Sequence, residues 1–249
     1  MERKVAFVTN AAEYAGRPAV DAMLGAGWQV FCHDRSFAEP SGRSRFETEH
    51  PGAIAAEEAE VAAFAAAGLA RFGRVDALIS NDVPGAERGN LRSGGHSDRL
   101  DQFEAFVDSL LLEPVRLLRA ALPAMKSARS GSVILVTSGA PLRVPLRTDS
   151  FGYVAARAGA NTLAQALALD LAPLGIQVNA VAPFYVYSQT FFPSEIGAAD
   201  PKFADELAGV IPMQRFGNPA EIGELIALLA RGKAGFVSGQ VIAFSGAAC

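Results

Sequence analysis

Cysteine and histidine are scarce in this sequence. Its 249 residues include two cysteines, Cys32 and Cys249, and three histidines. Neither the number nor the spacing of the cysteines indicates a disulfide framework, and the scattered histidines offer poor material for a metal site. We therefore expect a protein without a bound metal.

Long apolar runs and an excess of basic residues are also missing. No run approaches the roughly 18 apolar residues that a transmembrane helix requires. The N-terminus, MERKVAFVTN, has an apolar run too short for a secretory signal. With 22 basic and 26 acidic residues, the net charge is −4, whereas a nucleic-acid binder needs a concentrated basic face. We expect a cytoplasmic protein without membrane or nucleic-acid partners.

Apolar residues, by contrast, are plentiful: half of the chain is hydrophobic, enough for one well-buried core over residues 1–249. The runs expected to form buried strands are Val5–Thr9, Trp28–Cys32, Val75–Ser80, Ser132–Ser138, Ile176–Pro183 and Gln240–Phe244. The segments with a helical pattern are Pro18–Gly27, Glu57–Phe72, Asp101–Lys126, Phe151–Leu174 and Glu221–Ala230. Pro114 should kink or break the third of these helices. Ser36–Ala53 and Val83–Ser97 are polar or rich in glycine and proline, and are expected to be loops.

Strands and helices thus alternate along the chain, and the strands are apolar on both faces. This pattern predicts a single α/β domain with a doubly wound parallel sheet. Ligands of such sheets bind outside the carboxyl ends of the strands. The informative residues are therefore those at or just after Thr9, Cys32, Ser80, Ser138 and Pro183.

The segment after the first strand resembles a dinucleotide-binding loop that has lost its glycines. Thr9–Gly16 has the length of the T-G-x-x-x-G-x-G loop of short-chain dehydrogenases/reductases, but Asn10 and Tyr14 replace the first two glycines. A phenol at Tyr14 would project into the volume of a pyrophosphate or nicotinamide, and Glu13 adds a negative charge. An atypical but working cofactor loop stays open as the alternative.

Ser138, Tyr153 and Arg157 form the second pattern. Ser138 ends a strand, and Tyr153 and Arg157 lie four residues apart, on one face of the next helix. The superfamily has Tyr-x-x-x-Lys here. Arginine keeps a positive charge that favours an ionised phenol, but its planar fork differs in shape from the ammonium that holds the nicotinamide ribose. Taken singly, each residue has a structural explanation, a turn serine or a solvated arginine.

Together these patterns resemble the halohydrin dehalogenases, which are similar to short-chain dehydrogenases/reductases but lack the cofactor. Their T-x4-[FY]-x-G motif is matched by Thr9, Tyr14 and Gly16, and their S-x12-Y-x3-R motif by Ser138, Tyr153 and Arg157. One departure is that fourteen residues separate Ser138 from Tyr153 instead of twelve. The extra residues fall in a loop, which can absorb them without moving the strand or the helix.

The resemblance implies a Rossmann-like fold, a halide pocket in place of a cofactor, and the elimination of halide from a halohydrin to give an epoxide. In reverse, azide, cyanide or nitrite would open the epoxide. Asp82 would hydrogen-bond the arginine through a small side-chain network; a turn cap is the alternative explanation for this residue. The residues implied for the halide pocket are Tyr14, Pro183, Phe184, Tyr185 and Val186, and those for the substrate pocket are Val83, Pro84, Ala140, Tyr187, Phe191 and Phe192. A plain apolar patch is the alternative for the halide pocket.

Further expectations concern cofactor and assembly. The resemblance implies no cofactor, a halohydrin or epoxide and a small anion as ligands, and a homotetramer built through Asp101–Lys126, Phe151–Leu174 and Gln240–Phe244. The small residues of Phe151–Leu174 could instead pack that helix on its own sheet. Two other functions remain open: an NAD(P)-dependent reductase with an atypical loop, and a non-catalytic member of the superfamily.

Overall fold

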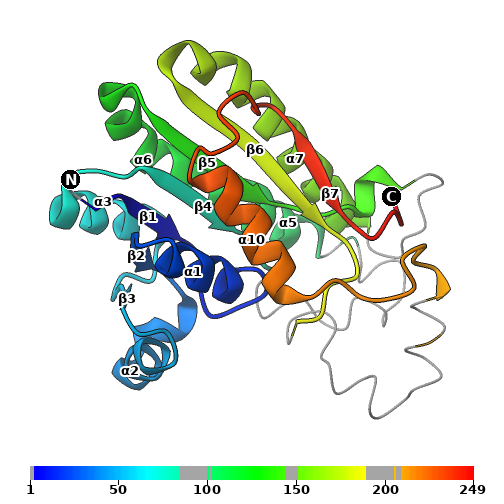
Figure 1. Ribbon diagram of the computed structural model, residues 1–249, viewed down its shortest axis with the longest axis horizontal. Coiled ribbons are helices and arrows are strands. Elements are labelled where there is room, and N and C mark those ends of the chain that lie inside the picture. Colours follow the sequence, from blue (N-terminus) through cyan, green and yellow to red (C-terminus); the bar gives the residue numbers. More distant parts are fainter. Residues whose placement is uncertain (1–2, 85–99, 101, 144–150, 189–204, 206–208) are drawn as a thin grey trace.

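A seven-stranded parallel sheet forms the centre of the molecule (Figure 1). The computed structural model describes residues 3–84, 100, 102–143, 151–188, 205 and 209–249. The strands are β1 (Val5–Val8), β2 (Gln29–Cys32), β3 (Ala53–Ala55), β4 (Ala77–Asn81), β5 (Gly131–Val136), β6 (Ile176–Pro183) and β7 (Val241–Phe244). Their order across the sheet is β3-β2-β1-β4-β5-β6-β7, so the chain reverses its direction of winding between β1 and β4. The predicted doubly wound α/β class is confirmed.

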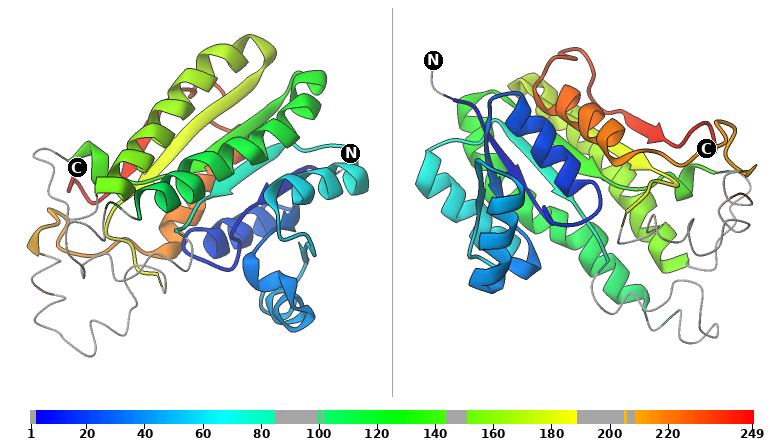
Figure 2. Two further views of the ribbon diagram at one scale, coloured as in Figure 1. Left: turned by 180° about the vertical axis from the view of Figure 1, so that it is seen from behind. Right: turned by 60° about the horizontal axis from the view of Figure 1, so that its bottom comes forward.

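Helices cover both faces of this sheet (Figures 1 and 2). The α-helices of the described residues are α1 (Gly16–Gly25), α2 (Pro40–Glu49), α3 (Val61–Phe72), α5 (Phe103–Val107), α6 (Glu113–Ala128), α7 (Phe151–Leu171) and α10 (Pro219–Ala230). Short helical turns lie at η1 (Arg35–Ala38), η3 (Asp108–Leu112), η4 (Ala140–Leu142) and η5 (Ala172–Leu174). One face carries α1 and α10, and the other carries α3, α6 and α7.

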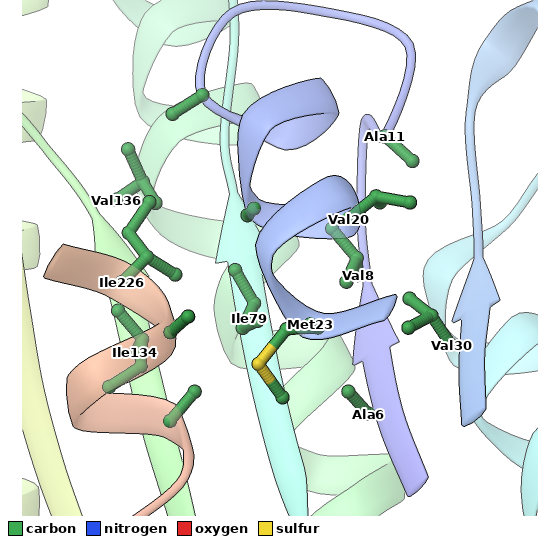
Figure 3. Packing of buried hydrophobic residues seen from close by; sticks show 14 of the residues in the cluster. Ala6, Val8, Ala11, Val20, Met23, Val30, Ile79, Ile134, Val136 and Ile226 are labelled. Carbon is green, nitrogen blue, oxygen red and sulfur yellow. The ribbon is translucent and has the colours of Figure 1, made fainter. Parts of the chain in front are cut away.

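The core is correspondingly divided into two apolar layers, one on each side of the sheet. Figure 3 shows the first layer, in which Val20 and Met23 of α1 face Val8 and Ile79 of the sheet. Both faces of the central strands are therefore buried, which explains why these strands are apolar without alternation.

The sequence prediction of Ser36–Ala53 as a loop is wrong. The segment contains η1, α2 and the beginning of β3. The helix α2 buries only one large apolar side chain, Phe46, which packs against Phe37. The segment therefore shows no apolar periodicity that would indicate a helix. The strand β3 is only three residues long, too short to show a periodicity.

The expected irregularity at Pro114 is confirmed. The helical segment after residue 102 passes through the π-helical turn η3, and Pro114 lies in the first turn of α6 directly after it. Because Pro114 supplies no N–H to the helical hydrogen-bond ladder, the ladder is interrupted next to this π-helical turn. The turn therefore divides the predicted helix Asp101–Lys126 into α5 and α6.

Candidate active site

The catalytic candidates meet at the carboxyl ends of the central strands. Ser138 lies two residues after β5 and is buried. Its hydroxyl accepts a hydrogen bond from the Ala140 N–H at 3.1 Å, and its carbonyl accepts one from Asn161 Nδ2 at 3.3 Å. The serine is therefore fixed from both sides, by η4 and by α7.

Tyr153 and Arg157 lie one turn apart on α7, as their spacing predicts. The guanidinium carbon of Arg157 lies 5.3 Å from the centre of the Tyr153 ring, a cation–π distance. The ring also makes an edge-to-face contact with Phe106 of α5, at 6.0 Å between centroids. These contacts place a permanent positive charge against the phenol.

Arg157 is completely buried, which rules out the alternative explanation of it as a solvated helix residue. Its two terminal nitrogens donate to backbone carbonyls, Nη1 to Val136 at 3.1 Å and Nη2 to Asp82 at 2.6 Å. Its Nε has no hydrogen-bond partner among the described residues. The charge is thus held by the ends of β5 and β4 rather than by a carboxylate.

Asp82 contacts the arginine through its backbone, whereas the family resemblance implies a side-chain network. The carboxylate of Asp82 instead accepts from the Ser80 hydroxyl, at 2.8 and 3.1 Å. Burial raises the pKa of Asp82 to about 7, against the lowering effects of Arg157 and Ser80. Near neutral pH the Asp82 carboxyl is therefore partly protonated and compensates the charge of Arg157 incompletely.

Tyr14 reaches the same place from the first loop. Its backbone has a φ of +48°, a left-handed conformation that is unusual for a bulky residue. Removal of the phenol from water raises its pKa well above the ordinary value; Tyr153 raises it further, and Arg157 lowers it. Both effects place Tyr14 within electrostatic range of Tyr153 and Arg157.

The first loop is closed on itself and on β2. The backbone N–H of Ala12 donates to Asp34 Oδ2 at 3.0 Å, and that of Ala11 donates to the His33 carbonyl at 2.8 Å. The other carboxylate oxygen of Asp34 accepts from the backbone and the hydroxyl of Ser36, at 2.9 and 2.6 Å. An acidic residue at this place in dinucleotide-binding folds holds the cofactor ribose. In this protein both carboxylate oxygens of Asp34 accept hydrogen bonds from the protein itself.

Gly16 is the glycine that the loop retains, and the structure explains why. A Cβ at Gly16 would collide with the backbone of Asn10 and Ala11. The glycine therefore permits close packing of α1 against the loop, a role separate from contact with a phosphate.

The segment after β6 carries the predicted halide residues. Pro183 ends the strand, and the rings of Phe184 and Tyr185 lie 4.1 Å apart between centroids. The Phe184 N–H donates to the Phe244 carbonyl at 3.0 Å, so this N–H is not available to bind an anion. Val186 is buried and pairs with Gly217 in an isolated bridge.

Arg143 adds a positive charge to this segment. Its Nη1 donates to the Tyr185 hydroxyl at 3.3 Å, and its guanidinium carbon lies 5.8 Å from the centre of the Phe184 ring. The η4 turn, which follows Ser138 directly, positions it. Sequence reasoning missed Arg143 because it lies within a loop without a recognisable motif.

The remaining predicted pocket residues are distributed around this edge of the sheet. Val83 and Pro84 are buried directly after β4, and Ala140 begins η4. Tyr187 stacks on Phe216 at 4.8 Å. Phe191 and Phe192 lie outside the described residues. Asn161 was also missed, although its position one turn after Arg157 on α7 is the signal that could have found it.

Among the described residues, no group of three or more histidine, cysteine, aspartate or glutamate side chains could hold a metal ion. The helices within those same ranges include none that is long and apolar enough to cross a bilayer.

Comparisons with known proteins agree with a Rossmann-like enzyme domain of this construction. A family profile described as enoyl-(acyl carrier protein) reductase matches residues 15–246. A curated relative, 2,3-dihydroxy-2,3-dihydro-p-cumate dehydrogenase of Pseudomonas putida, is 31% identical over 99% of this chain and 94% of its own. The chain therefore belongs to the short-chain dehydrogenase/reductase superfamily.

Solved structures provide a second kind of relative. A structure described as a dehalogenation enzyme superposes with a TM-score of 0.92 at 33% identity, over 100% of this chain and 99% of its own. A halohydrin dehalogenase bound to ethyl (2S)-oxiran-2-ylacetate superposes with a TM-score of 0.88 at 31% identity, over 98% and 96%. The chain is thus similar both to dehydrogenases and to dehalogenases of one superfamily.

Proposed function

We propose that this protein is a halohydrin dehalogenase: it converts a vicinal halohydrin to an epoxide and a halide ion without a nicotinamide cofactor, and catalyses the reverse opening of epoxides by azide, cyanide or nitrite. The observation that carries the proposal is the buried guanidinium of Arg157, which lies against the Tyr153 ring and donates its terminal nitrogens to backbone carbonyls. The superfamily has a lysine at this position that holds the nicotinamide ribose, and Tyr14 replaces a glycine of its cofactor loop.

The first loop supports the same conclusion. A dinucleotide would need the oxygens of Asp34 for its ribose and free amides of the loop for its pyrophosphate. Asp34 is instead bonded to Ala12 and Ser36, and the Ala11 amide is bonded to His33. Arg157 points its terminal nitrogens at two backbone carbonyls, so the ribose-binding role of the superfamily lysine has no equivalent. These residues do not fit the cofactor.

The proposed chemistry begins with proton transfer. The Ser138 hydroxyl orients the substrate oxygen, and Tyr153 accepts the hydroxyl proton as a phenolate favoured by the adjacent charge of Arg157. The substrate oxygen then forms a bond to the neighbouring carbon, while the carbon–halogen bond breaks and its electron pair leaves with the halide. No hydride moves. In reverse, Tyr153 returns the proton to the alkoxide.

The halide would leave toward Phe184, Tyr185 and Tyr14. The positive edges of aromatic rings attract an anion weakly, and Arg143 supplies a full charge close by. Among these groups Tyr14 is expected to keep its proton, because its pKa is raised. It therefore adds no negative charge that would repel the halide.

The decisive experiment measures halide release without nucleotide. Purified protein is incubated with 1-chloro-2-propanol or 1-bromo-2-propanol, and free halide and epoxide are quantified. We expect both products in equal amounts, with no dependence on added NADH or NADPH. The alternative, an NAD(P)-dependent reductase, is supported by the similarity to a dehydrogenase. It is tested by titrating the protein with NADH or NADPH and measuring the nucleotide fluorescence. Micromolar binding of either nucleotide, with no halide released, would refute the proposal.

A further inference from the structure

The two strands that carry the candidate site separate just before it. Val136, the last residue of β5, lies opposite Asn81, the last residue of β4. Beyond this pair the chain still runs along β6, because the amides of Thr137 and Gly139 donate to carbonyls of that strand at 2.8 and 2.9 Å. Backbone groups of alternate residues point to opposite sides of a strand. The carbonyls of Val136 and Ser138 therefore face the side on which β4 has ended.

Two side chains of α7 supply donors to these carbonyls in place of a strand. Arg157 Nη1 donates to the Val136 carbonyl at 3.1 Å, and Asn161 Nδ2 donates to the Ser138 carbonyl at 3.3 Å. The two donors lie one helical turn apart, on the face of α7 that also carries Tyr153. One helix face therefore carries the proposed proton acceptor, its neighbouring charge and the donor that holds the serine backbone.

The hydrogen bond from Asn161 bypasses the loop between Ser138 and Tyr153. Fourteen residues separate these two, which is two more than in the S-x12-Y-x3-R motif. Each added residue increases the conformational freedom of a connection, so a longer loop holds its ends together less closely. Asn161 joins α7 to Ser138 directly. The placement of the serine relative to the tyrosine therefore does not depend on the length of that loop.

Asn161 is also a costly residue at this position. It is 5% exposed, and its Oδ1 has no hydrogen-bond partner within the part of the chain that the structure describes. A buried amide oxygen without a donor lowers stability, and asparagine has a lower helix propensity than leucine. Stability alone would therefore favour an apolar side chain. The hydrogen bond to Ser138 gives the asparagine a role that an apolar residue cannot fill.

We infer that Asn161 is a positioning residue for the proposed reaction: it holds Ser138 in register with Tyr153, so that both hydroxyl groups reach the same substrate oxygen. The inference rests on the proposed function and adds to it a residue that acts only through Ser138. The hydrogen bond from the serine to the substrate oxygen strengthens as negative charge develops on that oxygen. Misplacement of the serine should therefore lower kcat more than it raises KM.

Asn161→Leu tests this role, because leucine is similar in size and favours the helix. We expect kcat for halide release from 1-chloro-2-propanol to fall about tenfold, the effect of one lost hydrogen bond, with KM changed less than about twofold. In the Ser138→Ala background the same substitution should lower the rate less than about twofold, because the group through which it acts is gone. An equal fall in both backgrounds, or the full rate in a folded Asn161→Leu protein, would overturn the inference.

The pH dependence of kcat distinguishes Ser138 from Arg157 as the group that Asn161 acts on. Asn161→Leu should leave the Arg157 guanidinium against the Tyr153 ring, so the pH at which kcat is half-maximal should stay unchanged. A shifted pH profile would show that Asn161 acts on the arginine and the tyrosine, and would overturn the assignment to Ser138.

Asn179→Leu is the matched control. Asn179 is also a buried asparagine whose side-chain amide donates to a backbone carbonyl, that of Val237 at 2.9 Å. It lies on β6 opposite Ile134, away from the site, so its replacement should lower stability without lowering kcat. If Asn161→Leu does not fold, Asn161→Asp takes its place. The ionised aspartate keeps the shape of asparagine and lacks the donor, so the same fall of about tenfold is expected.

Hydrogen exchange separates this inference from the proposed function. The Ala140 amide donates to the Ser138 hydroxyl, so displacement of the serine should speed deuterium uptake in residues 139–143. We expect faster uptake in Asn161→Leu and no change in Asn179→Leu. Unchanged uptake in Asn161→Leu would overturn the inference even in a protein that releases halide. If the unmodified protein releases no halide, the dehalogenase proposal fails, and faster uptake would still show that Asn161 positions Ser138.

Discussion

Asn10 and Asn81 exchange side-chain hydrogen bonds with each other's backbone. Asn10 Nδ2 donates to the Asn81 carbonyl at 2.8 Å, and Asn81 Nδ2 donates to the Asn10 carbonyl at 2.9 Å. Both residues are buried, and Asn81 Nδ2 also donates to the Glu13 carbonyl at 2.9 Å. The first loop is therefore tied to the end of β4, at the point where the sheet reverses its winding. Asn10 replaces a glycine of the superfamily loop, and its side chain helps to hold the first loop against the end of β4.

The asparagine pair should be worth measurable stability. Asn10→Ala and Asn81→Ala each leave a buried carbonyl without its donor, so we expect each to lower the free energy of unfolding by about 1–3 kcal/mol. Because the two bonds are reciprocal, the double variant should lose less than the sum of the single losses. Urea denaturation of the four proteins measures this; strict additivity would contradict the reciprocal pairing.

Tyr153→Phe tests the proton acceptor. The substitution removes one hydroxyl and keeps the edge-to-face contact with Phe106, so the fold should persist. We expect halide release to fall by about 10²–10⁴-fold, the usual contribution of a general base. Circular dichroism provides the control for folding. A folded variant that keeps more than about a tenth of the rate would exclude Tyr153 from this role.

Arg143 should control the use of anionic nucleophiles. Replacing it by glutamine removes the positive charge beside Phe184 and Tyr185 while leaving a hydrogen-bond donor. A charge at this partly exposed position is worth about 1 kcal/mol, so we expect KM for azide in epoxide opening to rise roughly fivefold. Arg129→Gln is the matched control, because Arg129 ends α6 and bonds to the Pro173 carbonyl, away from the site. Equal values of KM for azide in both variants would remove Arg143 from the anion site.

Asp82 should make stability depend on pH. Its pKa is about 7 in the folded protein and 3.8 ordinarily, so the folded state holds a proton that the unfolded state releases between these values. This contribution to stability is complete below about pH 4 and is lost as the pH rises through about 7, at up to about 1.4 kcal/mol per pH unit. Asp82→Asn should therefore show a flatter stability profile across this range.

The control for this profile is Asp108→Asn. The pKa of Asp108 is lowered by its hydrogen bond to Arg116, so its contribution has the opposite sign and disappears at acid pH. Asp108 is exposed, and the effect should be small. Denaturation midpoints measured across the pH range distinguish the two variants. If the stability of Asp82→Asn falls with rising pH as steeply as that of the unmodified protein, another group titrates.

The homotetramer stays a prediction, and exposed apolar side chains suggest where to test it. Leu169 of α7 is 82% exposed, and β7 is the edge strand of the sheet. Two two-fold contacts through these elements would close into a tetramer. Light scattering should give four times the chain mass of 26.0 kDa, and Leu169→Glu should reduce it to dimers. A monomeric mass for the unmodified protein would contradict the assembly.

The sequence was sufficient to predict most of the sheet and the catalytic candidates. The strand Ile176–Pro183 was predicted with its observed bounds, because a β-branched apolar run between a glycine and a proline leaves little choice. The four-residue spacing of Tyr153 and Arg157 likewise fixed their common helical face. Such features depend on neighbours along the chain, which the sequence displays directly.

Contacts between distant segments were less predictable. Nothing local indicates that Asp34 would bond to the Ala12 amide, or that Arg157 would take the carbonyl of Asp82 in place of its carboxylate. Arg143 and Asn161 acquire their roles only when the ends of β5, β6 and α7 come together. Their significance follows from tertiary geometry, and a single sequence without that geometry gives each of them an ordinary explanation.

Under the proposed function, the burial of Arg157 opposes stability to activity. Its guanidinium is completely enclosed and donates to two carbonyls, while Nε has no partner within the part of the chain that the structure describes, and a buried charge with such partners costs free energy. An apolar side chain of similar length could stabilise the fold while removing the charge beside Tyr153. Selection for heat resistance alone would therefore favour inactive variants at this position. Engineering for robustness has to be screened for turnover at the same time.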